Sequence, residues 1–150
     1  GELEIRNLFD ADAELVIRYS FESGELVRRA GESLFFLPLM QHHIGRNLPV
    51  TLPRRHAIVI PNPFTVETSI EVELPAGWRC LTMADEHIEA RPASFDYRVD
   101  CTGGKLDINR VLRIGKGRIS PSNAERFKRF LDRVDSLEAR PIEILPPAAP

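Results

Sequence analysis

A strict alternation of apolar and polar residues marks one stretch of the chain, "FTVETSIEVEL" at residues 64–74. A period of two places successive side chains on opposite faces of a strand. One face takes Phe64, Val66, Thr68, Ile70, Val72 and Leu74, and the other takes Glu67, Ser69, Glu71 and Glu73. The pattern predicts a strand with one face buried and the other in water.

Several further segments have the composition of strands. "AELVIRYSFE" and "SFDYRVDC" alternate in the same way, "SLFFLPL" is apolar on both faces, and "RHAIVIP" is short and ends at a proline. "KLDINRVLRI" follows "SFDYRVDC" across a "TGG" turn, where glycine supplies the positive φ of a tight hairpin. A last short strand is expected at "PIEIL".

One segment near the end has a helical period instead. The apolar residues of "SPSNAERFKRFLDRVDSL" recur every three or four positions, at Phe127, Phe130, Leu131, Val134 and Leu137. Ser120 or Ser122 is predicted to cap this helix, with Pro121 in its first turn and Glu125 at capping-box spacing from Ser122. We expect a helix over about residues 121–138 that packs its apolar stripe on another element.

Many short strands with turn signals, followed by one helix, indicate a mainly β fold. We predict an antiparallel β-sandwich with one C-terminal amphipathic helix. A chain of 150 residues suits a single domain, which we place at residues 1–145, with 146–150 as a tail.

Composition removes some classes of function. The net charge is −2, so no global positive field draws the chain to nucleic acid, and no apolar run is long enough for a membrane span. The first residues, "GELEIRNLFD", contain no secretory signal, and we expect the sequence to be a domain cut from a longer protein.

The two cysteines have three interpretations. Cys80 lies in a strand-like "WRCLT" with the parity of Trp78, and Cys101 continues the inward parity of Phe95, Tyr97 and Val99. Two small core residues are the favoured interpretation, a disulfide between them is the alternative, and a catalytic thiol has the least support.

No other residues predict catalysis or a cofactor. Histidines at 42 and 43 lack the paired spacing of a metal site, and no serine elbow or phosphate-binding loop is present. The least regular stretch is 41–55. It supplies the candidate interaction surface, His42, His43, Arg54 and Arg55.

The second half of the chain resembles a known family. The resemblance covers roughly residues 54–140 and rests on "IPNPF", "VELPAGW", "NRVLRI", "GRIS" and the Phe-rich helix after it. These features, in this order, resemble the C-terminal β domain that follows the core of bacterial transglutaminase-like proteins.

The resemblance implies a non-catalytic sandwich. The family's Cys-His-Asp triad would belong to a preceding core in the same polypeptide, and we do not carry it onto Cys80, His87 and Asp96. Proteins of this kind are typically exported to the periplasm or cell envelope, which would favour the disulfide.

Two functions follow as expectations. The first is an accessory interaction domain that packs on the transglutaminase-like core or binds an envelope partner. The alternative is a carbohydrate- or ligand-binding sandwich, for which only Tyr19 or Trp78 offers an exposed aromatic ring. A free-standing enzyme is the least favoured hypothesis.

Overall fold

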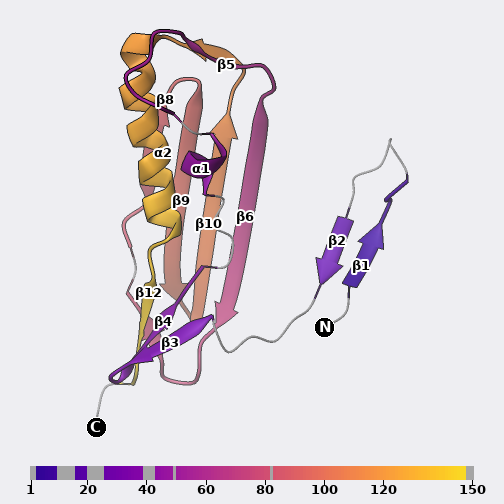
Figure 1. The fold of residues 1–150 in the computed structure, drawn as a ribbon. Coiled ribbons are helices and arrows are strands. Elements are labelled where there is room, and N and C mark those ends of the chain that lie inside the picture. Colours follow the sequence, from indigo (N-terminus) through magenta and orange to yellow (C-terminus); the bar gives the residue numbers. More distant parts are fainter. Residues whose placement is uncertain are drawn as a thin grey trace.

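A four-stranded antiparallel sheet forms one layer of the protein, in a computed structural model that describes residues 3–9, 16–19, 26–38, 43–48, 50–81 and 83–147. Its strand order is β6-β10-β9-β8 (Figure 1). The strands are β6 (Phe64–Glu73), β10 (Lys105–Ile114), β9 (Ala93–Thr102) and β8 (Glu86–Ala90). Each follows an alternating segment of the sequence, and the "TGG" turn joins β9 to β10 with Gly103 and Gly104 at positive φ.

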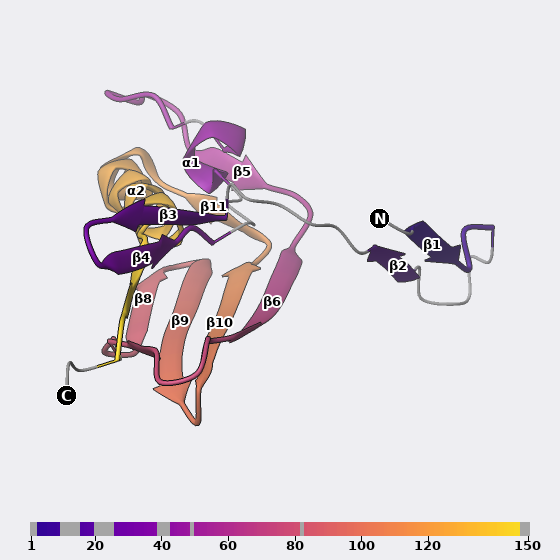
Figure 2. The same ribbon diagram turned by 90° about the horizontal axis from the view of Figure 1, so that it is seen from below.

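The alternation separates a dry face of this sheet from a wet one. On β9 and β10 the inward row is almost completely buried, and it consists of Phe95, Tyr97, Val99, Leu106, Ile108, Arg110, Leu112 and Ile114. The opposite face lies toward solvent, as the view from below shows for the whole sheet (Figure 2). One face therefore needs a second layer.

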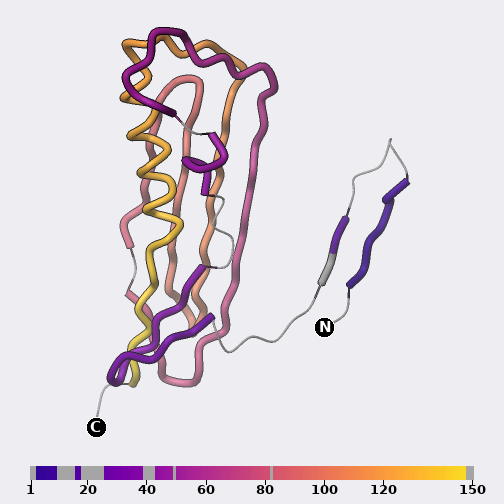
Figure 3. The backbone as a smooth tube through the Cα atoms, viewed as in Figure 1, coloured from indigo at the N-terminus to yellow at the C-terminus, as the bar shows by residue number. Residues whose placement is uncertain are grey.

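That second layer is part sheet and part helix. A smaller antiparallel sheet has the order β3-β4-β12-β7, and helix α2 lies beside it over the same face of the main sheet (Figure 2). Its strands are β3 (Val27–Ala30), β4 (Ser33–Phe36), β12 (Ile142–Leu145) and β7 (Arg79–Cys80). Figure 3 shows the chain leaving α2 and entering β12, which pairs with β4. The predicted mainly β, antiparallel fold with one C-terminal helix is confirmed, and the helix fills part of the second layer.

Helix α2 (Ala124–Glu138) buries the stripe that its sequence predicted. Phe127, Phe130, Leu131, Val134 and Leu137 are all 5% exposed or less. The predicted serine caps are wrong. Ser120 precedes a 3₁₀ turn, η1 (Pro121–Asn123), and Asn123 precedes α2, and neither side chain caps its helix. Pro121 fits the first position of η1, where a missing N–H costs nothing.

Three short elements lie outside these two sheets. They are α1 (Ile44–Asn47), β5 (Ile58–Ile60) and β11 (Gly117–Ile119), with β5 paired to β11. The backbone N–H of Gly45 donates to Asp135 Oδ2 at 3.1 Å, which ties α1 to α2. A Cβ on residue 45 would lie 2.8 Å from the same carboxylate oxygen, which is too close, so this approach of α1 to α2 favours glycine.

A separate hairpin precedes all of these elements. It consists of β1 (Leu3–Arg6) and β2 (Val16–Tyr19), and in both Figure 1 and Figure 2 it stands away from the two layers. The assignment of residues 1–145 to one domain stays a prediction. No helix among the described residues is long and apolar enough to cross a membrane.

Candidate functional site

The residues of the predicted interaction surface differ in exposure and in hydrogen bonding. His43 is exposed and starts α1 with a left-handed backbone, φ 46°. Arg54 is half-buried and its Nε donates to the His56 carbonyl at 3.3 Å, whereas Arg55 is exposed. His42 lies outside the described residues. Among the described residues no hydrogen bond or ion pair joins His43 to either arginine, so their assignment as one surface stays a prediction.

Cys80 and Cys101 form a disulfide in the structure, the arrangement that the sequence left as an alternative. Their Cα atoms are 5.7 Å apart. The bond joins β7 of the small sheet to β9 of the main sheet, so it connects the two layers and does not join neighbouring strands. Because a disulfide has no free thiol, Cys80 offers no nucleophile in this state.

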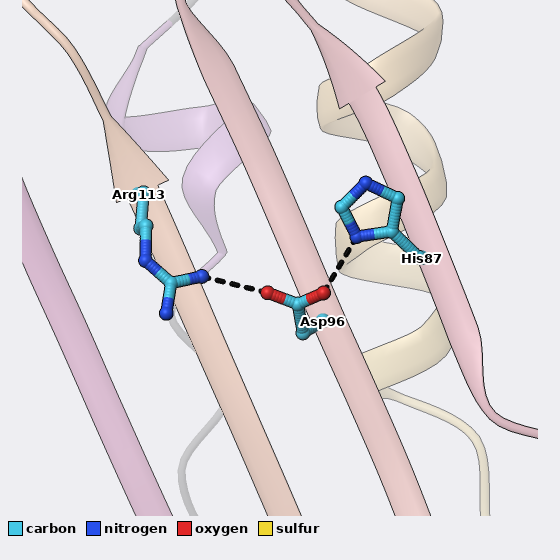
Figure 4. A network of polar contacts seen from close by, with 3 residues as sticks. All are labelled: His87, Asp96 and Arg113. Atoms are coloured by element: carbon cyan, nitrogen blue, oxygen red, sulfur yellow. Dashed lines mark hydrogen bonds and ion pairs between the residues drawn. The ribbon is translucent and has the colours of Figure 1, made fainter.

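His87, Asp96 and Arg113 lie in a row on the outer face of the main sheet (Figure 4). His87 Nδ1 is 2.6 Å from Asp96 Oδ1, and Arg113 Nη1 donates to Asp96 Oδ2 at 2.6 Å. Strand register explains the meeting, since His87 is directly opposite Asp96 and Arg113 is diagonal to it across β9 and β10. The hydrogen bond with His87 lowers the pKa of Asp96, slight burial opposes this, and Arg113 lowers it further.

This row has the form of a surface ladder that links three strands. Its side chains are 63%, 45% and 48% exposed, so solvent screens their charges. Cys80 is bonded to Cys101, whose parity on β9 is opposite to that of Asp96, and it therefore lies on the other side of the sheet. The structure brings two of the three triad-type residues together and keeps the third apart.

A second polar cluster is buried between the sheet and the end of α2. Arg110 and Glu138 are 2% and 0% exposed, and Arg110 Nη1 lies 3.5 Å from Glu138 Oε1. Tyr97 is directly opposite Arg110 in the β9–β10 register. Burial lowers the pKa of Arg110 and raises that of Tyr97, since each loses hydration of its charged form.

Within this cluster few hydrogen bonds compensate for burial. The described atoms give no hydrogen-bond partner to the Tyr97 hydroxyl or to any of the three side-chain nitrogens of Arg110. This cluster was not predicted, although strand parity and helical period could have indicated it. Arg110 takes the place of an apolar residue between Ile108 and Leu112, and Glu138 continues the helical stripe four residues after Val134.

No group of three or more metal-ligating side chains could hold an ion among the described residues. The described features considered further are the hairpin β1–β2, the outer ladder and the buried pair.

The family model described as a domain of unknown function with a solved structure, DUF3858, matches residues 32–144. The chain belongs to this family. The match spans β4 to β12 and contains the disulfide, the ladder and the buried pair, whereas the hairpin and β3 precede it. No curated protein matches the chain.

One solved structure has a similar fold. It is the crystal structure of a "putative protease" from Parabacteroides distasonis ATCC 8503, with a TM-score of 0.59 and 13% sequence identity. The alignment covers 75% of this chain and 23% of that chain. At this identity the likeness concerns the fold, and the DUF3858 chain spans about a quarter of the other protein's length.

Proposed function

We propose that this DUF3858 chain is a non-catalytic accessory domain of a larger bacterial transglutaminase-like protein, in which it packs on the core of the same polypeptide. The small share of the neighbour that the chain covers supports a place within a longer protein. The observation that carries the docking is the hairpin β1–β2, which leaves an apolar face open to solvent.

Strand register gives this hairpin two different faces. Leu3, Ile5 and Ile17 share one face, because Ile5 is directly opposite Ile17 and Leu3 is two residues from Ile5. These side chains are 67%, 45% and 53% exposed. Glu4 and Arg6 project from the other face and form an ion pair of 2.6 Å.

The loop after β1 extends the apolar surface. Leu8 is 57% exposed and Phe9 is 97% exposed. A lone two-stranded hairpin is only marginally stable in water, and clustered exposed apolar residues mark surfaces that meet a partner. A partner from the same polypeptide would bury this face permanently, which suits an amphipathic element of this kind.

The proposal also includes export to the periplasm or cell envelope. The Cys80–Cys101 disulfide supports it, since such bonds persist in oxidising compartments. Two rings were named for the glycan-binding alternative. Trp78 is half-buried and so poorly placed to stack on a sugar, and the side chain of Tyr19 lies outside the described residues.

The test compares two double variants in the full-length protein and in the isolated chain. Ile5→Thr with Ile17→Thr removes the apolar face, and Glu4→Thr with Arg6→Thr alters the polar face of the same hairpin. Full burial of each isoleucine would contribute about 2 kcal/mol. Calorimetry should therefore show a lower melting temperature for the first variant in the full-length protein and little change in the isolated chain.

The polar-face variant should behave like the wild type in both settings. Equal melting temperatures for both variants in the full-length protein would contradict docking through the apolar face. The proposal also expects a Cys-His-Asp core encoded upstream of Gly1, and a different upstream domain would overturn the transglutaminase-like assignment.

A further inference from the structure

Strand β6 forms an open edge of the main sheet. It is ten residues long and, among the described residues, pairs only with β10. Figures 1 and 2 both show it at the outer end of the four strands. An antiparallel edge strand leaves every second pair of backbone N–H and C=O groups without a ladder partner, which makes it a template for another strand.

The inward side chains of β6 are less buried than their partners on β10. Phe64 is 39% exposed, although Ile114, its partner in register on β10, is 1% exposed. Val66, Ile70 and Val72 are half-buried, whereas their partners on β10 are fully buried. A further strand with inward apolar side chains would continue the core and cover this row.

An apolar groove of about 360 Å³ opens at the beginning of β6. Its walls include Leu48, Val50, Ile58, Val59, Phe64 and Phe127. Val59 is 61% exposed, so the groove is accessible from solvent. An apolar side chain at one end of an added strand could enter this groove beside Phe64.

The outward row of β6 is acidic. It carries Glu67, Glu71 and Glu73, of which Glu71 is bound by Lys105 at 2.7 Å. Among the described residues Glu67 forms no ion pair. A second copy is a poor occupant, because two-fold pairing centred on Ser69 would set Glu67 opposite Glu71 of the other copy, and like charges in that position are destabilising.

We propose that the free edge of β6 binds an extended peptide segment that alternates apolar and basic residues. Its backbone would add a fifth strand to the sheet, the known mode of β-strand addition. Its apolar side chains would continue the row of Phe64, Val66 and Ile70, with one in the groove. Its lysines or arginines would lie beside Glu67 and Glu73.

The test titrates the full chain with a fluorescein-labelled peptide of about ten alternating valine and lysine residues. A peptide of the same composition with its valines and lysines in separate blocks is the control. Anisotropy should show saturable binding of the alternating peptide alone, and amide exchange should slow along β6. Equal binding of both peptides, or unchanged exchange on β6, would overturn the proposal.

Two charge-reversal variants distinguish binding at the β6 edge from a general effect of net charge. Glu67→Lys with Glu73→Lys should weaken binding at least about tenfold, because it reverses the row beside the peptide. Glu32→Lys with Glu125→Lys changes the net charge equally at exposed sites away from β6 and should have little effect. Equal losses in both variants would contradict the assignment.

The edge and the hairpin can be judged separately. The Ile5→Thr and Ile17→Thr variant should bind the peptide like the wild type, so loss of hairpin docking would leave the edge proposal standing. Slower β6 exchange that depends on protein concentration without peptide would identify a second copy as the occupant and overturn it.

Discussion

At the scale of single residues, Arg110 and Glu138 are the clearest exception to the apolar pattern of the core. Each occupies a position where alternation or helical period calls for an apolar side chain, and each is at least 98% buried. Their mutual attraction offsets a large loss of hydration. A buried ion pair is weak evidence that a fold is stable, but removing only one of its two partners is strongly destabilising.

Removing one partner should therefore cost far more than removing both. Arg110→Ala removes the cation beside the buried Glu138 carboxylate and should lower the free energy of unfolding by about 3–5 kcal/mol. Arg110→Met combined with Glu138→Leu should be near the wild type, since it replaces charge with apolar volume. Urea denaturation measures both.

A double variant as unstable as Arg110→Ala would contradict the view that the loss comes from an uncompensated buried charge. The Tyr97 hydroxyl, without a described partner, supplies a third position for comparison. Tyr97→Phe should then be close to neutral, because it removes a polar atom that gains no hydrogen bond in the fold.

At the scale of elements, the Cys80–Cys101 disulfide joins the two layers. The bonded residues are 21 positions apart in sequence, and the chain between them includes β8 and much of β9. Closing a loop of this length restricts the unfolded chain, and the bond fixes the short strand β7 against the sheet. β7 is two residues long, so few backbone hydrogen bonds hold it in its sheet.

Reduction should therefore destabilise the protein measurably. A loop of this length predicts a loss of about 3 kcal/mol in the free energy of unfolding. Guanidinium denaturation with and without dithiothreitol measures it. The Cys80→Ala and Cys101→Ala double variant should have the denaturation midpoint of the reduced wild type, and dithiothreitol should not change it. A wild-type midpoint that dithiothreitol leaves unchanged would contradict the stabilising role of the bond.

The residue pattern predicts individual strands and helices better than it predicts the contacts between them. The strands β6, β9 and β10 and the stripe of α2 follow from period alone, because each has one face in water and one in the core. Helix capping did not follow, since Ser120 and Ser122 hydrogen-bond each other at 2.8 Å and the chain enters α2 through a 3₁₀ turn.

At the scale of the whole molecule, long-range contacts decide what the sequence could not. Period shows that Cys80 and Cys101 point inward, but only the placement of β7 over β9 brings their sulfurs together. The ladder of His87, Asp96 and Arg113 likewise depends on the register of three strands. The open β6 edge depends on strand order, which local pattern does not specify.

In our proposal, this DUF3858 domain docks on the rest of a longer polypeptide through the apolar face of β1–β2. Hydrogen–deuterium exchange of the full-length protein and of the isolated chain tests it most directly. Docking should make exchange of residues 3–6 and 16–19 slow in the full-length protein, and the same amides should exchange fast in the isolated chain. Equally fast exchange in both would contradict it.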